Sequence, residues 1–199
     1  MTNCVIFDFE TMSTDRVNGV VLNMALLVFD ESKYISDPYT YMELVEQCKL
    51  IKFDVAEQVE KYKRAICKDT LAWWGNQSKE AQKQLRPSAD DVSIEKLYDF
   101  WMDNTVNYNI QKVYSRGNTF DPIFFDYILE QTGFNHSDAV KHWTVRDTRS
   151  TIEGMAWGHD IKNSFVPEGL EEHFVAHDPR HDIAMDVMRM QTLAQALEG

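Results

Sequence analysis

The sequence has few cysteines, few positive charges and no long apolar run, and each shortage excludes a class of protein. Its three cysteines, Cys4, Cys48 and Cys67, are odd in number and far apart, so neither a disulfide framework nor a zinc site is expected. No apolar stretch approaches the roughly 18 residues that a membrane helix needs, and no secretory leader pattern opens the chain. We therefore expect a protein of the reducing cytoplasm, with no membrane as partner.

Positive charge is also scarce, because 20 Lys and Arg stand against 32 Asp and Glu for a formal net charge of −12. Such a chain does not hold nucleic acid by charge alone, since that mode of binding needs clustered lysine and arginine. One segment, 49–86, reverses the balance with nine basic and five acidic residues. It is either an ordinary solvated surface or a rim that follows a phosphate backbone, and the sequence leaves both interpretations open.

What the sequence does contain is an alternation of strand-like and helix-like segments. Strands are predicted over 3–10, 20–29, 39–45, 112–116 and 142–146. Helical patterns cover 54–85, 92–104, 122–130, 148–157 and 179–197. The first two strands are expected to pair as a hairpin through Asn18-Gly19. The whole pattern predicts one α/β domain over residues 1–199, with a mixed sheet flanked by helices and a helical insertion at about 54–104.

Two carboxylates lie on one face of the first predicted strand. Strand side chains alternate between faces, so Asp8 and Glu10 point to one side while Phe7 and Phe9 point to the other. The apolar run before them is typical of a strand covered on both faces. Buried carboxylates need an ionic partner, a hydrogen bond or a metal ion. On this segment alone, a solvated strand end explains the pair as well as a divalent cation does.

A further carboxylate, Asp121, lies where a predicted strand ends and a helix begins. It stands before Pro122, which is favoured in the first turn of a helix, and an aspartate in that place is commonly explained as an N-cap. Its location is still informative, because ligands of open α/β sheets bind where strands end and helices begin.

The third candidate region is the run from His177 to Asp186 at the start of the last predicted helix. Asp186 lies at the edge of the apolar stripe of that helix. His181 is five residues earlier, and a histidine beside a semi-buried carboxylate suits a general base. His177 and Asp182 show the same five-residue offset and are the alternative pair. We prefer His181 with Asp186, because Asp182 is turned further from the apolar stripe and His177 precedes the helix.

These segments together carry a resemblance to a known superfamily. Asp-x-Glu-Thr at 8–11, Asn-x-Phe-Asp at 118–121 and His-x4-Asp at 181–186 resemble the three motifs of the DEDDh 3′–5′ exonucleases, which have an RNase H-like fold. Within that superfamily the chain most resembles the phage exodeoxyribonuclease A type and the Rv2179c-like exoribonucleases. Asp-Phe-Glu-Thr-Met at 8–12 and Phe-Val-Ala-His-Asp-Pro-Arg-His-Asp at 174–182 carry this closer likeness.

The resemblance implies an activity and a set of site residues. Two divalent ions, Mg²⁺ or Mn²⁺, would be held by four carboxylates, namely Asp8, Glu10, Asp121 and Asp186, with His181 as the general base. The implied reaction is 3′–5′ hydrolysis of single-stranded ends to nucleoside 5′-monophosphates. DNA is the expected substrate and RNA the alternative, and a non-catalytic nucleic-acid-binding module on this scaffold is the rival function. The likeness to phage enzymes further implies a phage-encoded protein that acts in the host cytoplasm.

Contacts with the substrate are expected around the first motif and from a pair of tryptophans. In the family, the residue after the first motif stacks on or wedges the terminal base, which makes Met12 the candidate, flanked by Phe9 and Thr11. Trp74 is a candidate for stacking on single-stranded bases, although adjacent tryptophans at a helix start more often pack in the core. Arg116, at the end of a predicted strand, is a candidate contact for phosphate.

Overall fold

The computed structural model describes residues 2–198, and Met1 and Gly199, the two ends of the predicted domain, lie outside the described residues. Five strands form one sheet in the order β3-β2-β1-β4-β5. Their bounds are β1 (Asn3–Thr11), β2 (Val21–Asp30), β3 (Lys49–Lys52), β4 (Lys112–Ser115) and β5 (Val145–Asp147). β2 is antiparallel to β1 and β3, whereas β4 is parallel to β1 and β5. The predicted mixed sheet, with its first two strands paired as antiparallel neighbours, is confirmed.

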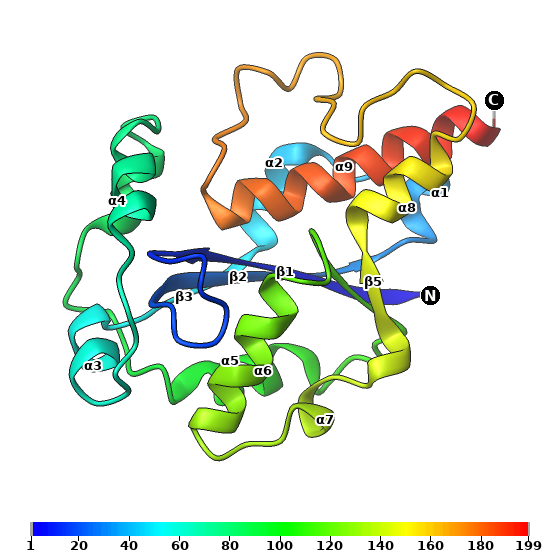
Figure 1. Ribbon diagram of the computed structural model, residues 1–199. Helices are drawn as coiled ribbons and strands as arrows, with labels where there is room; N and C mark the ends of the chain where they lie inside the picture. The colour runs from blue at the N-terminus through cyan, green and yellow to red at the C-terminus, as the bar shows by residue number, and fades with distance from the viewer. Residues whose placement is uncertain (1, 199) are drawn as a thin grey trace.

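Helices cover both faces of this sheet (Figure 1). Over one face lie α1 (Lys33–Ser36), α2 (Tyr41–Gln47), α8 (Thr148–Met155) and α9 (Pro179–Glu198). Over the other lie α5 (Lys96–Thr105), α6 (Asp121–Gln131) and α7 (His136–Ala139). Between β3 and α5 the chain forms α3 (Val55–Glu60), α4 (Lys68–Gly75) and the 3₁₀ helix η1 (Ala81–Leu85), and a second 3₁₀ helix, η2 (His142–Thr144), leads into β5. Within residues 2–198, no helix combines the length and hydropathy that a membrane crossing requires.

Alternation along β1 divides the core into two layers. Phe7 and Phe9 pack with the side chains of α5 and α6, whereas Cys4 and Ile6 pack with those of α9. Because the period of a strand is two residues, the face that carries Cys4 and Ile6 also carries Asp8 and Glu10. The two carboxylates therefore face the side of the sheet that α9 covers.

Two of the predicted strands differ from the structure. Residues 41–47 form α2, not part of a strand over 39–45, because Thr40 begins a capping box: its hydroxyl accepts a hydrogen bond from the Glu43 N–H, and the Glu43 carboxylate accepts one from the Thr40 N–H. The third strand, β3, follows that helix. β5 begins at Val145, three residues later than the predicted strand over 142–146, because η2 occupies the intervening turn.

Several elements converge at the edge of the sheet where β1 ends. β1 and β4 are parallel and therefore end at the same edge, where α6 begins shortly after β4. α9 packs against β1 and β2 on the face of the sheet that carries Asp8 and Glu10. α4 reaches it from the segment between β3 and α5, since the Trp74 indole donates to the Thr11 carbonyl at 2.9 Å. Residues far apart in the sequence are thus brought together at one place.

Candidate active site

A cleft of about 990 Å³ opens at this edge of the sheet. It is lined by residues of β1, of α4, of the turn before α6 and of the start of α9. The titratable groups that belong to the predicted motifs and line it are Asp8, Glu10, Asp121, His177 and Asp182. All three motif regions therefore contribute to one cleft.

The carboxylates of the cleft lack cationic partners. Glu10 is 7% exposed and Asp121 is 3% exposed. None of the ion pairs described for residues 2–198 includes Asp8, Glu10, Asp121 or Asp182. Buried anions without a counter-charge are costly, so this arrangement points to a cation from outside the chain.

Asp121 is directed toward β1 and does not cap its own helix. α6 begins at Asp121 itself, with Phe120 in the N-cap position and Pro122 in the first turn. The Asp121 carboxylate accepts a hydrogen bond from the Phe9 N–H at 3.2 Å. The N-cap explanation of this aspartate is therefore wrong, and its side chain belongs to the carboxylate group of the cleft.

The third motif enters the cleft through His177 and Asp182. Ligand atoms of Glu10, His177 and Asp182 all lie within 4.8 Å of one another, close enough to share a metal ion. The Asp182 carboxylate also accepts a hydrogen bond from the His177 N–H at 2.8 Å. The structure thus brings the alternative pair, His177 and Asp182, to the carboxylates of β1.

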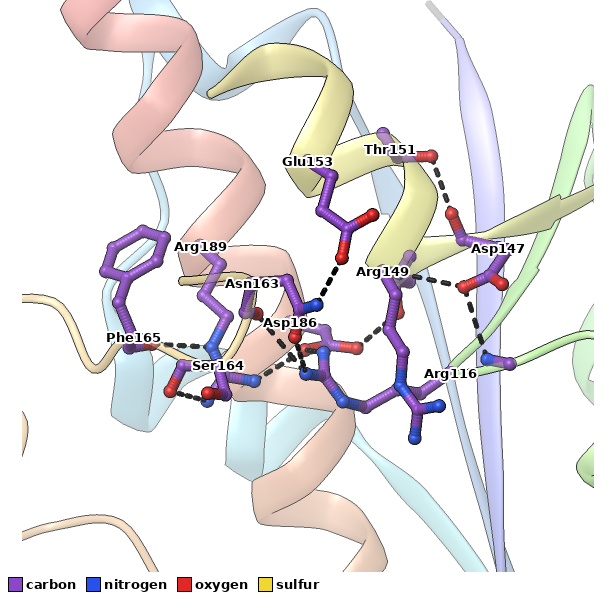
Figure 2. Close-up of polar contacts among 12 residues, drawn as sticks. Arg116, Asp147, Arg149, Thr151, Glu153, Asn163, Ser164, Phe165, Asp186 and Arg189 are labelled. Atoms are coloured by element: carbon purple, nitrogen blue, oxygen red, sulfur yellow. Dashed lines mark hydrogen bonds and ion pairs between the residues drawn. The ribbon is translucent and has the colours of Figure 1, made fainter. Parts of the chain in front are cut away.

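The preferred pair, His181 and Asp186, lies elsewhere. His181 is directed at α2, where its Nδ1 is 2.7 Å from the Tyr41 hydroxyl. Asp186 is 1% exposed and lies one helical turn beyond Asp182. Figure 2 shows its carboxylate between Arg116 and Arg189, whose guanidinium groups approach to 2.7 and 2.6 Å.

Asp186 is therefore buried, as predicted, but its surroundings do not fit the predicted role as a metal ligand. Two arginines and the Thr148 hydroxyl already satisfy the Asp186 carboxylate, so it needs no metal ion. The structure thus does not support the preference for His181 with Asp186. Asp182 is the carboxylate of α9 that faces the cleft, because the helix begins directly above the end of β1.

Burial perturbs the titration of the whole cluster. The pKa of Asp8 is raised well above its usual range by desolvation first and then by Asp121 and Glu10, and the pKa of Glu10 is raised by desolvation and then by Asp182. Desolvation also raises the pKa values of Asp121 and Asp182 to about 7. For His177 the same burial lowers the pKa, which keeps the imidazole neutral near pH 7. Hard oxygen ligands of this kind suit Mg²⁺ or Mn²⁺.

These shifts predict that the metal-free protein loses stability as the pH rises from about 4 to about 7. The Asp121 carboxyl titrates near 7 in the folded state and near 3.9 in an unfolded chain, so between those values the folded state binds more protons and ionisation favours unfolding. The free energy of unfolding in EDTA is expected to fall by roughly 1–4 kcal/mol from this cluster.

Urea titrations in EDTA at pH 5 and pH 8 measure this effect. Asp121→Asn should reduce the difference between the two pH values, whereas Asp103→Asn, at an exposed position of α5, should leave it unchanged. If the free energy of unfolding depended on pH in the same way in the wild type and in Asp121→Asn, this result would contradict the assigned burial of the Asp121 charge.

The predicted substrate residues of the first motif divide between the cleft and the core. Phe9 and Thr11 line the cleft, but the Phe9 ring is 3% exposed, so Phe9 presents its backbone. Met12 packs with Leu22 and Trp74 and is not among the residues that line the cleft. The structure therefore does not support the prediction of a stacking role for Met12.

The two tryptophans have different surroundings. Trp74 is fully buried and its indole nitrogen is bonded to Thr11, so the prediction that it stacks on substrate does not fit the structure. Trp73 is 42% exposed, lines the cleft, and has its ring centroid 4.7 Å from that of His177. Helical periodicity could have separated the pair, because adjacent residues of a helix face different sides.

Three arginines line the cleft, and they are not equivalent. Arg116, the predicted phosphate contact, is tied to Asp186 and Asn163. Arg16 donates to the Thr119 carbonyl at 2.8 Å. No hydrogen bond or ion pair of the Arg149 guanidinium occurs among residues 2–198, and Figure 2 shows it directed away from the Asp186 cluster. Arg16 was missed in the sequence because nothing near it marks a site.

The positive segment 49–86 does not supply these cations. None of its basic residues lines the described part of the cleft. Several of them are paired, as Lys61 is with Glu95 at 2.7 Å, and Arg64 donates to the Gly19 carbonyl at 2.8 Å. The structure therefore favours an ordinary surface for this segment over a rim for phosphate.

Comparisons with known proteins show the family of the chain. The family model described as the 3'-5' exoribonuclease Rv2179c-like domain matches residues 3–186. An exodeoxyribonuclease of Enterobacteria phage T4 is 35% identical over 201 residues, which cover 94% of this chain and 86% of that protein.

Solved structures of exonuclease I share the fold. One has a TM-score of 0.62 at 12% identity and is matched over 100% of this chain and 42% of its own. The zinc-bound E. coli exonuclease I complex with single-stranded DNA has a TM-score of 0.58 at 14% identity, over 100% and 40% of the two chains. The chain therefore spans about two fifths of those structures, and the expected RNase H-like fold is confirmed. Because the family model covers residues 3–186, the chain belongs to the 3'-5' exoribonuclease Rv2179c-like domain family.

Proposed function

We propose that the protein, as one domain over residues 1–199, is a divalent-metal-dependent 3′–5′ exonuclease that releases nucleoside 5′-monophosphates from single-stranded ends. The observation that carries the proposal is the group of four carboxylates without cationic partners beside a half-buried histidine, in a chain of a 3′–5′ exonuclease family. A protein that only binds nucleic acid has no need of such a group.

The residues that would hold the ions are Asp8, Glu10, Asp121 and Asp182. Their oxygens are the ligands that Mg²⁺ and Mn²⁺ prefer, and such ions would take further ligands from substrate phosphate. When bound, two such ions stabilise the attacking and leaving oxygens of a phosphodiester displacement. The added positive charge also lets a polyanion approach a chain with a formal net charge of −12.

His177 is the proposed general base. Its imidazole is half buried at the cleft, beside Glu10 and Asp182. The lowered pKa leaves the ring neutral near pH 7, so it can accept the proton that the attacking water loses. His181, which contacts Tyr41, and Asp186, which is paired with Arg116 and Arg189, take no part in this step.

Two exposed groups of the cleft suit a single strand. Trp73 offers an aromatic face of the kind on which unpaired bases stack, a contact worth about 1–3 kcal/mol per base. Arg149 offers a guanidinium without an acceptor in the described chain, which suits a backbone phosphate. Together they would hold one base and one phosphate of a single strand in the cleft.

DNA is the proposed substrate, supported by the exodeoxyribonuclease of phage T4 and by the E. coli exonuclease I complex with single-stranded DNA. RNA is the alternative, supported by the description of the family as exoribonucleases. The phage relative also supports action in the host cytoplasm. Recognition of a 2′-hydroxyl decides between the two substrates.

Digestion of matched DNA and RNA oligonucleotides tests this proposal. With Mg²⁺ or Mn²⁺, a label on the 3′-terminal nucleotide should appear first as a mononucleotide, and the single-stranded DNA should disappear fastest. EDTA should stop the reaction. Internal cuts, or loss of a 5′ label first, would contradict the proposed polarity. Tight binding without turnover under either metal would instead favour the binding module.

A further inference from the structure

His177 has a backbone conformation that few residues other than glycine adopt. Its φ is 66°, in the left-handed region, where a side chain is strained and the surrounding structure must hold the backbone in place. The described residues 156–178, which precede α9, contain no helix or strand. Regular backbone hydrogen bonding therefore does not hold His177, and other contacts must do so.

Side chains on both sides of His177 provide those contacts. The His177 N–H donates to the Asp182 carboxylate at 2.8 Å. The next residue, Asp178, is 6% exposed and forms an ion pair with Arg180 at 2.7 Å. Its carboxylate also accepts a hydrogen bond from the side-chain amide of Gln84 at 3.1 Å. This last contact joins two segments that are 94 residues apart in the sequence.

Gln84 is itself held from the other side by the central sheet. Its side-chain carbonyl accepts a hydrogen bond from the Asn23 amide at 2.6 Å, and Asn23 lies opposite Glu10 in the ladder between β1 and β2. Asn23, Gln84 and Asp178 are 0%, 8% and 6% exposed. A buried chain of hydrogen bonds thus runs from the strand neighbour of Glu10 to the sequence neighbour of His177.

We propose that Gln84 is a positioning residue for the general base. Through Asp178 it fixes the backbone at His177, so that the imidazole faces Glu10 and Asp182. This inference rests on the proposed role of His177. It gives η1, which lies in the segment between β3 and α5, an indirect part in catalysis although none of its residues lines the cleft.

The chemistry of the side chain explains why glutamine suits this position. An amide donates and accepts at once, and Gln84 must donate to Asp178 while it accepts from Asn23. Glutamate keeps the shape but has no N–H for Asp178 and adds a negative charge beside it. Methionine keeps the length but makes neither bond. Both substitutions remove the Gln84 contact of Asp178 while its ion pair with Arg180 remains, and so leave the strained backbone at His177 less restrained.

Gln84→Met and Gln84→Glu test the inference. We expect kcat on a short oligonucleotide to fall by about 10–100-fold, the range seen when a residue that orients an active-site group is lost. KM should change little, because Gln84 does not touch the substrate. Amide hydrogen exchange should become faster in peptides that cover 175–182, where the His177 N–H is protected by Asp182.

Gln82→Met is the matched control. Gln82 lies two residues away and its amide donates to the carbonyls of Gly75 and Gln77, so it stabilises the same segment without reaching Asp178. It should keep a kcat within about threefold of the wild type, a range far below the 10–100-fold loss expected for Gln84. Exchange over 175–182 should be unchanged.

Three results separate the inference from the proposed function. The inference is overturned if the Gln84 variants keep both kcat and exchange at the wild-type level while His177→Ala is inactive. It is also overturned if Gln82→Met lowers kcat as much, because the effect then comes from general loosening of the segment. An inactive wild type would refute the proposed function instead, and exchange over 175–182 would still report whether Gln84 restrains the loop.

Discussion

Asp8→Asn is expected to abolish exonuclease activity, with kcat lowered by about 10⁴-fold or more. Asp8 lines the cleft beside Glu10, and the Asp121 carboxylate is bonded to the backbone of its neighbour Phe9. A carboxylate in that position would be one of the ligands of the bound ions. Loss of 10⁴-fold in rate corresponds to about 5.5 kcal/mol of transition-state stabilisation, a reasonable share of what two bound ions would supply at the reacting oxygens.

The loss of activity should not be a loss of fold. Asparagine has nearly the shape of aspartate and carries no charge, so Asp8→Asn removes a buried anion that lacks a partner in the metal-free chain. We therefore expect the variant to unfold at a higher temperature than the wild type in EDTA, and to lose much of the stabilisation that Mg²⁺ provides.

Single-turnover rates with a 3′-labelled oligonucleotide, together with melting curves in EDTA and in Mg²⁺, measure both effects. Asp103→Asn serves again as the control, since it removes a carboxylate from an exposed position of α5. A variant at Asp8 that keeps a tenth of the wild-type rate would contradict the assignment of the site.

Much of the site could be predicted from local pattern. The alternation of a strand forces Asp8 and Glu10 onto one face, and β1 has that alternation in the structure. Asp121 follows a strand and opens a helix, which brings it to the end of β1 because β1 and β4 are parallel. These predictions depend on backbone geometry alone, so they needed no knowledge of which side chains meet.

The parts that could not be predicted depend on partners from distant segments. Asp186 lies on the buried side of α9 as predicted, and only the fold shows that Arg116 and Arg189 neutralise it. The sequence likewise does not show that Thr11 offers the carbonyl to which the Trp74 indole donates, although helical periodicity places Trp73 and Trp74 on different sides of α4. The capping box at Thr40 is different, since Thr-x-x-Glu was visible in the sequence and outweighs the strand-like content of residues 39–45.

A pair of histidine variants decides the register of the third motif. We expect His177→Ala to lower kcat by about 10²–10⁴-fold, the usual contribution of a general base. The kcat of His181→Ala should stay within about threefold of the wild type, a much smaller change than the loss expected for a general base. The reason is that the His181 imidazole is bonded to Tyr41 on the far side of the helix start. Initial rates between pH 5 and pH 9 measure both. The acidic limb of the profile should change shape only in the His177 variant.

Asp182 and Asp186 of α9 should also give different results, with activity affected at Asp182 and stability affected at Asp186. Asp182→Asn removes a ligand oxygen from the cleft and should be nearly inactive yet folded. Asp186→Asn leaves Arg189, which is 5% exposed, without its counter-charge, and breaking a buried pair typically costs about 3 kcal/mol or more. Its main effect should therefore be a lower melting temperature, with turnover per folded molecule reduced far less than in Asp182→Asn.

If His181 and Asp186 proved essential to turnover while His177 and Asp182 did not, the preferred register would be restored and the cleft described by Glu10, His177 and Asp182 would not be the catalytic one.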